Sequence, residues 1–346
     1  MMKKTHLLLI LAMVASAGLQ AQLLPRLGGQ RAGISALTFL KIDPSPRSAA
    51  MASANVSTMG DAYSTFTNPA GLADVDKFSI AASNTFWPAG INYAFFSAIK
   101  PTRVGFFGLS AASLTTGKME RRTEFQPDGT GQYFSASNTA IGLTYSQRLT
   151  DYFSYGVTLK YVNEQLAEYM AHTGVVDLGF LYRTDWKDLS FAVAMMAFGT
   201  NSKLNGSYQP DLLNSKPVTL GSYPAPTLFK LGVSMVPWKR DDMSLTTIVQ
   251  LNHPNDNAEN IRIGLEYEYK KLLYLRAGYK INVDDEVYPT AGVGIRAHIG
   301  KHPLHIDYAV DPTRYLGWIH RVGLSFGFNK LDREKKNEEA APAPAN

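Results

Sequence analysis

The residues of this chain that could bind a metal ion are its histidines, and their spacing argues against such a site. A catalytic zinc helix places two histidines on one helical face, and no pair here has that arrangement. His302 and His305 are three residues apart, but Pro303 lies between them and an extended strand would place them on opposite faces. The others after residue 21 are isolated: His172, His253, His298 and His320. We therefore expect no metal site and no cofactor.

A second group of potential ligands is oxygen-rich. The segment from Asn252 to Asn260 contains four asparagines, Asp256 and Glu259, which is enough oxygen for calcium in principle. Asparagine and aspartate side chains more often bond their own backbone in turns, so we favour a turn. We interpret Asp284, Asp285 and Glu286 as a solvated loop.

No other motif indicates catalysis or nucleic-acid binding. The chain has no cysteine and no Gly-x-Gly-x-x-Gly after a strand, and no serine has an identifiable base, although a Ser-His-Asp site assembled in space stays open. The formal charge falls from +5 to +3 if Lys3 and Lys4 are removed with a leader, which is too dilute for a nucleic-acid partner. We expect a protein that is not an enzyme.

The elements that must position these residues are strands. From Ile261 to Tyr269 every odd residue is apolar or aromatic, while Arg262, Glu266 and Glu268 stand at even positions beside a glycine. This period of two is the pattern of a strand with one apolar and one polar face. It recurs in residues 157–161, 293–300 and 322–328.

About fourteen such segments follow Phe78, and the connections between them tend to alternate between long and short. An up-and-down barrel in an outer membrane has long loops outside and tight periplasmic turns. Aromatic residues near strand ends fit interfacial girdles: Phe86, Trp87, Tyr133, Phe134, Tyr152, Phe153, Tyr315 and Trp318. The pattern predicts an all-β, transmembrane, antiparallel up-and-down barrel of about 14 strands. A half-buried soluble sheet is the alternative, because it alternates in the same way strand by strand.

The chain divides into four predicted parts. Residues 1–21 resemble an export signal, with Lys3 and Lys4 before an apolar stretch too short to span a membrane. Residues 22–77 lack alternation, and their apolar residues predict a plug, or hatch, inside the barrel lumen, the alternative being a disordered leader. Residues 78–329 form the barrel, and residues 330–346 a disordered periplasmic tail. We expect the outer membrane of a Gram-negative bacterium, with both termini periplasmic and membrane lipid as a partner.

In this barrel, seven charged residues would face a wet or plugged lumen: Lys160, Arg262, Glu266, Glu268, Arg276, Lys280 and Arg296. The apolar positions that alternate with them would face acyl chains. Closure leaves no strand edge, which satisfies the backbone groups that hydrocarbon cannot.

The stretch from Leu37 to Met51, followed by Asp61-Ala62 and by Asn68-Pro69-Ala70-Gly71, resembles the PorV/PorQ family of outer-membrane proteins, which is similar to FadL-type barrels. The resemblance is strongest over residues 33 to 75. It implies a fourteen-stranded barrel with Asn68, Pro69, Ala70 and Gly71 in an N-terminal hatch. Where the family commonly carries Gly-Gly or Gly-Asp, this chain has Ala52-Ser53, so a turn that needs glycine is built differently here.

The resemblance implies an accessory of the type IX secretion system of Bacteroidetes, which partners a translocon or receives cargo with a C-terminal signal. The candidate partner-binding loop, residues 199–225, contains Tyr208, Leu212, Leu213 and Tyr223. One alternative is a FadL-type channel for small hydrophobic molecules, which would need an apolar internal pocket. Another is a structural barrel that contacts a lipoprotein or periplasmic ring through its C-terminal tail.

Overall fold

The computed structural model describes residues 33–58, 60–208, 218–283 and 288–328. The predicted signal segment (1–21), the predicted tail (330–346), and Leu212 and Leu213 of the candidate loop lie outside these ranges. None of the described helices is long and apolar enough to cross a membrane.

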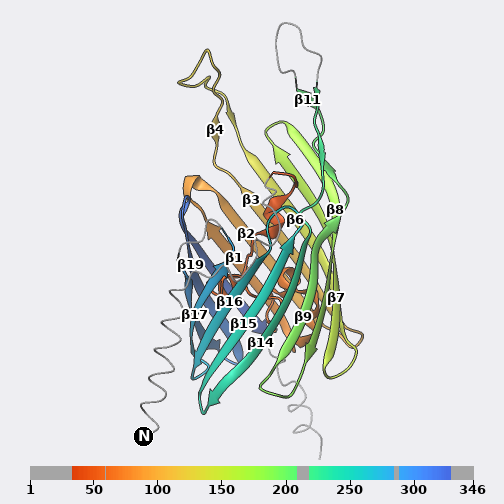
Figure 1. The fold of residues 1–346 in the computed structure, drawn as a ribbon, viewed down its shortest axis with the longest axis vertical. Helices are drawn as coiled ribbons and strands as arrows, with labels where there is room; N and C mark the ends of the chain where they lie inside the picture. The colour runs from red at the N-terminus through yellow and green to blue at the C-terminus, as the bar shows by residue number, and fades with distance from the viewer. Residues whose placement is uncertain (1–32, 59, 209–217, 284–287, 329–346) are drawn as a thin grey trace, which may run out of the picture.

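Fourteen antiparallel strands form one closed barrel, which confirms the predicted fold (Figure 1). Neighbouring strands are consecutive along the wall, and β1 closes the barrel against β20. The strands are β1 (Phe78–Phe86), β2 (Asn92–Pro101), β3 (Phe106–Thr115), β6 (Ala136–Arg148), β7 (Phe153–Leu166), β8 (Tyr169–Arg183), β9 (Ser190–Gly199), β14 (Leu228–Arg240), β15 (Met243–Pro254), β16 (Asn260–Tyr269), β17 (Leu273–Ile281), β18 (Thr290–Ile299), β19 (His302–Thr313) and β20 (Gly317–Phe328).

The two ends of the barrel differ in their connections. Phe78 pairs with Phe328, so the first and last strands enter and leave at the same end, where all connections are short. We call this the turn end and the opposite one the loop end. The loop end carries the long connections, but two hairpins there are short: β7 and β8 are joined by only Ala167 and Glu168, and β19 and β20 by residues 314–316. The predicted alternation therefore holds only in part.

Two connections at the loop end extend into two-stranded arms that project beyond the wall (Figure 1). One arm is the pair β4 (Met119–Glu120) and β5 (Tyr133–Phe134). The second arises between β9 and β14 and contains β10 (Ser202–Lys203), β11 (Ser207–Tyr208), β12 (Val218–Thr219) and β13 (Ser222–Tyr223). Tyr133 and Phe134 thus lie in an arm and not in an aromatic girdle as predicted.

The alternating pattern separates the two faces of the wall. Exposed apolar side chains point outward on most strands, for example Leu109, Ile141, Leu143, Leu159, Ile263, Leu275, Val293, Ile306 and Leu324. Of the seven charged residues predicted to face inward, Lys160, Glu266 and Arg276 are buried. Lys280 pairs with the carboxylate of Asp311, at 3.0 Å. The remaining three, Arg262, Glu268 and Arg296, line cavities inside the barrel.

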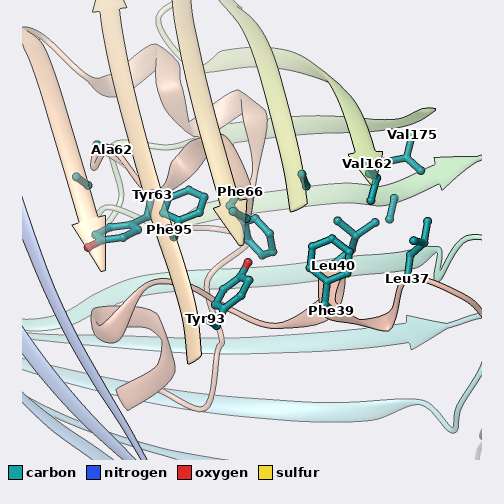
Figure 2. Close-up of a cluster of buried hydrophobic side chains, with 14 of the residues drawn as sticks. Leu37, Phe39, Leu40, Ala62, Tyr63, Phe66, Tyr93, Phe95, Val162 and Val175 are labelled. Carbon is teal, nitrogen blue, oxygen red and sulfur yellow. The ribbon is translucent and has the colours of Figure 1, made fainter. Parts of the chain in front are cut away.

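In residues 33–58 and 60–77, the N-terminal segment contains only short helices: η1 (Thr38–Lys41), α2 (Pro46–Ala50), α3 (Ser64–Thr67) and η2 (Pro69–Asp74). A further short helix, η3 (Pro88–Gly90), joins β1 to β2. Helices this short are not stable on propensity alone. They are held instead by a buried cluster that includes Phe39, Leu40, Tyr63 and Phe66 and that continues onto inward-facing Tyr93 and Phe95 of β2 (Figure 2).

Candidate functional site

The candidate site is the interior of the barrel, where residues 33–77 contact the wall on opposite sides. Tyr63 donates a hydrogen bond to the carbonyl of Ala82 on β1 at 2.9 Å. On the other side, the Gln250 side chain of β15 accepts hydrogen bonds from the backbone nitrogens of Asn55 and Val56 at 2.8 and 2.9 Å. The segment therefore lies inside the barrel and bridges its walls.

The motif residues Asn68, Pro69, Ala70 and Gly71 begin η2 and are buried. The Asn68 side chain caps the helix by accepting from the nitrogen of Ala70 at 3.0 Å, and it donates to the carbonyl of Val56 at 2.7 Å. Asparagine suits this position because its amide accepts and donates at once. Ser146 and Ser154 of the wall donate to the Ala70 carbonyl at 3.4 and 3.3 Å.

A ring of inward-facing glycines fits the wall closely around this segment. At each position an added Cβ would lie less than 3.0 Å from an atom of residues 46–72, so no larger residue fits without displacement. We call these residues the glycine ring: Gly108, Gly156, Gly179, Gly232, Gly264, Gly278, Gly292 and Gly323, from eight different strands. The ring holds the backbone of the segment in place on both sides.

The turn at Ala52-Ser53 has the backbone of a glycine turn, although neither residue is glycine. Both residues adopt left-handed backbone conformations, with φ of 57° and 58°. The Ala52 nitrogen donates to Thr290 at 2.9 Å, and the Ser53 carbonyl accepts from Gln250 at 3.4 Å. The chain thus keeps a conformation that favours glycine and stores the strain, of about 1 kcal/mol or more per residue.

An ionic network joins α2 to β16, β17 and β19. Two nitrogens of Arg47 bind the two oxygens of Glu266 at 2.8 and 2.7 Å, and Arg276 binds Glu266 at 2.6 Å and Asp307 at 2.5 Å. Burial alone lowers the pKa of Arg47, but the charge of Glu266 and its hydrogen bonds outweigh this and raise the pKa above its ordinary value. Arg47 therefore stays charged.

A second buried pair holds the opposite wall. Lys160 of β7 binds Asp177 of β8 at 2.5 Å and lies over the ring of Phe66, 4.7 Å from its centroid. The other Asp177 oxygen accepts the backbone N–H of Ala197 at 2.7 Å, where β9 bulges and Ala197 has a φ of 52°. Asp177 thus positions the bulge that forms one wall of a cavity.

This loop-side cavity, of about 350 Å³, lies between the N-terminal segment and β9, β14, β15 and β16. Part of its lining is apolar and includes Leu40, Phe66, Met196 and Leu228. The rest carries amides and charged groups, among them Lys41, Asp43, Asn55, Lys230, Asn252, Asn260 and Arg262. Such a mixed lining suits a molecule with an apolar body and a polar head.

Lys230 is the unusual residue of this cavity. Its side chain is buried, and its contact is a hydrogen bond to the Asn55 amide oxygen at 3.4 Å. In the described part of the chain it makes no salt bridge. Asp43, the carboxylate lining the same cavity, instead accepts from the Ser45 nitrogen at 3.0 Å and the Asn55 amide at 2.8 Å. A buried cation without an ionic partner is costly unless an anion joins it.

Sequence reasoning missed Lys230, although a signal was available. It alternates with Phe229, Leu231 and Val233 in a strand with period two, so it could have been placed inside. The prediction that Trp87 belongs to an interfacial girdle is wrong. Instead of forming a girdle, its ring packs against the inner cluster, 6.5 Å from Tyr93.

The candidate partner-binding loop is only partly described. The backbone of Tyr208 belongs to β11, and Tyr223 belongs to β13, where it is exposed. Among the described residues, no group of three or more His, Cys, Asp or Glu side chains is placed to hold a metal ion.

No protein-family model and no curated protein matches the chain. Solved structures do. The CymD monoaromatic hydrocarbon channel matches with a TM-score of 0.57 at 11% identity, covering 83% of this chain and 98% of that one. The toluene transporter TodX of Pseudomonas putida has a TM-score of 0.57 at 12% identity, with the same coverage. A FadL homologue of Pseudomonas aeruginosa has a TM-score of 0.51 at 9% identity, covering 87% and 100%.

Identities this low show the fold alone. The comparisons add nothing to the PorV/PorQ resemblance, which stays a prediction. The chain therefore has the closed fourteen-stranded fold of FadL-like barrels.

Proposed function

We propose that this protein is an outer-membrane barrel whose loop-side cavity admits small amphipathic anions, as the first step of uptake. The observation that carries the proposal is Lys230, a buried cation without an ionic partner in a cavity whose lining is partly apolar. A carboxylate would pair with Lys230 while an apolar body lies against Phe66, Met196 and Leu228.

The outer face of the wall supports a membrane location. Large apolar side chains are exposed on strands all around the barrel, and water-soluble proteins rarely expose a continuous apolar surface of this extent. In an outer-membrane barrel the short turns face the periplasm. We therefore propose that the turn end, where β1 begins and β20 ends, faces the periplasm and that the two arms face the cell exterior.

The structural neighbours support a channel for hydrophobic compounds, since they include a monoaromatic hydrocarbon channel and a toluene transporter. A hydrocarbon has no charge to offer Lys230, so we assign this chain an anionic ligand. The N-terminal segment acts as a plug, because the glycine ring and the Arg47–Glu266 pair fix its backbone.

Binding of 4-phenylbutyrate and 4-phenylbutanol to the purified barrel in detergent tests the proposal, because the two differ in the anionic group. We expect the acid to bind at least about tenfold more tightly, and Lys230→Met to remove that advantage while the alcohol binds as before. Lys280→Met is the matched control, because Lys280 is paired with Asp311 and does not line the cavity. Equal binding of acid and alcohol by the unmodified protein would contradict the proposal.

A second candidate is the accessory role in type IX secretion that the PorV/PorQ resemblance implies. The β4–β5 arm favours it, because Phe125 near the tip is 93% exposed on a two-stranded hairpin that lacks a supporting sheet. Deletion of residues 118–134 tests this role. We expect cargo with C-terminal signals to be lost from the cell surface, and an unchanged secreted proteome would count against it.

A further inference from the structure

A second cavity lies at the turn end of the barrel. This turn-side cavity, of about 260 Å³, is bounded by the N-terminal segment and by β1, β16, β17, β18, β19 and β20. The side chains that line it carry both signs of charge, and Tyr274, His305 and Phe326 add aromatic surface. Both cavities are lined by the N-terminal segment, by β16 and by residues in or between β17 and β18. Their other lining elements differ.

Most charges of the turn-side cavity are paired with each other. Arg47 and Arg276 bind Glu266 and Asp307 in the ionic network, and Arg47 also lies 3.6 Å from Asp61. These pairs leave little charge for a ligand.

Arg296 and Glu268 are different. Over the described ranges of the chain, neither side chain takes part in a salt bridge, and the Nε of Arg296 is buried without a hydrogen-bond partner. Both residues line the cavity. A cation and an anion that face one space without pairing can each bind the opposite charge of a single ligand.

Their spacing along the wall leaves room for such a ligand. Glu268 lies on β16 and Arg296 on β18, so their backbones are two strands apart, about 10 Å. Tyr274 lies on the strand between them, directly across from Glu268, and its ring is 6.1 Å from that of His305. His305 in turn pairs across the sheet with Arg296. An aromatic surface thus lies between the two charged groups.

We propose that the turn-side cavity binds a small zwitterion, an aromatic α-amino acid. Its carboxylate binds the Arg296 guanidinium, its ammonium group binds the Glu268 carboxylate, and its ring lies against Tyr274. Arginine matches a carboxylate with two parallel hydrogen bonds. This site is distinct from the loop-side cavity and from the anion proposed to bind there.

Three related ligands test the proposal with the purified full-length protein. Phenylalanine carries both charges, 3-phenylpropionate only the carboxylate, and phenethylamine only the ammonium group. By isothermal titration calorimetry we expect phenylalanine to bind at least about tenfold more tightly than either analogue, because each analogue leaves one charged side chain unpaired.

Two variants assign the groups. Arg296→Gln should weaken the binding of phenylalanine and 3-phenylpropionate about tenfold and leave the binding of phenethylamine unchanged. Glu268→Gln should weaken the binding of phenethylamine and leave that of 3-phenylpropionate unchanged. Electrophoretic mobility of unheated samples verifies that each variant is a folded barrel. Lys230→Met is the control for the other cavity, and it should leave phenylalanine binding unchanged.

Equal affinity for the three ligands, or phenylalanine binding that survives Arg296→Gln in a folded barrel, would overturn this site. Loss of phenylalanine binding in Lys230→Met would also overturn it, because the amino acid would then occupy the loop-side cavity. Binding of 4-phenylbutyrate tests the loop-side cavity alone, so a negative result for one cavity does not count against the other.

Discussion

The N-terminal segment is held differently by two arcs of the same wall. Against β1, β2 and β3 it packs mainly through aromatic side chains, with Tyr63 stacked on Phe95 at 5.8 Å and Phe66 edge-on to the same ring. Against β16, β17 and β19 it is held by Arg47 through two hydrogen bonds to Glu266. Apolar contact is non-directional, whereas a two-pronged ion pair fixes an orientation.

The difference indicates that the two arcs have different roles. The aromatic arc supplies most of the apolar burial, and the ionic arc sets how α2 is oriented. The glycine ring is common to both, because it sets how closely the segment approaches the wall. Each of these three statements can be tested by substitution, with urea unfolding in lipid vesicles followed by tryptophan fluorescence.

The largest effect is expected in the glycine ring. Gly278→Val would place its Cβ against the backbone of Met51 and Ala52, which flexible side chains cannot relieve. We expect a loss of more than about 3 kcal/mol, seen as failure to recover folded barrel. Gly117→Val is the control, because a Cβ there meets only the Ala89 carbonyl at 3.8 Å. Equal recovery of both variants would show that the ring does not set the approach.

Next is the ionic arc. Arg47→Met removes one partner of a largely buried pair, and we expect a loss of about 3 kcal/mol in the free energy of unfolding. Arg148→Met is the comparison, because Arg148 pairs with Asp74 but is 41% exposed, so less than about 1 kcal/mol is expected. If both variants lost the same small amount, α2 would not depend on its ion pair.

On the aromatic arc, two tyrosines can be compared through their hydroxyl groups. Tyr63→Phe removes the hydrogen bond to the Ala82 carbonyl and should cost about 1 kcal/mol. Tyr93→Phe removes a buried hydroxyl that has no partner among the described residues, so stability should stay the same or rise. The opposite order would mean that the hydroxyl of Tyr93 has the more important contact.

The smallest effect is expected at the strained turn between the arcs. Ser53→Gly relieves a left-handed backbone but makes the unfolded chain more flexible, so we expect a net gain of about 0.5 kcal/mol. Ser57→Gly, at a residue of the same segment that has no positive φ, is the control and should lose stability. A loss in Ser53→Gly would show that the turn is not strained.

Much of the fold could be predicted because a strand alternates with a period of two. The pattern from Ile261 to Tyr269 predicted which side chains face inward, and Glu266 and Arg262 do so. The arms and the inward turn of Trp87 could not be predicted, because aromatic residues near strand ends have the same local pattern whether they face lipid, solvent or the interior.

The candidate sites could be predicted less well from the sequence. Arg47 and Glu266 are 219 residues apart, and nothing local pairs them. Glycines in the wall can be recognised in the sequence, but their role depends on which backbone lies opposite, as Gly278 and Ala52 show. Whether Lys230 and Arg296 have an ionic partner likewise depends on which side chains the fold places beside them.

By itself, the sequence determined the closed strand fold and the polarity of each face, because both follow from residue order along one strand. Only the tertiary structure decided which charges are paired and which face a cavity without a partner. Pairing depends on distances between strands and on the packing of the N-terminal segment, and these distances are set by closure of the barrel around that segment.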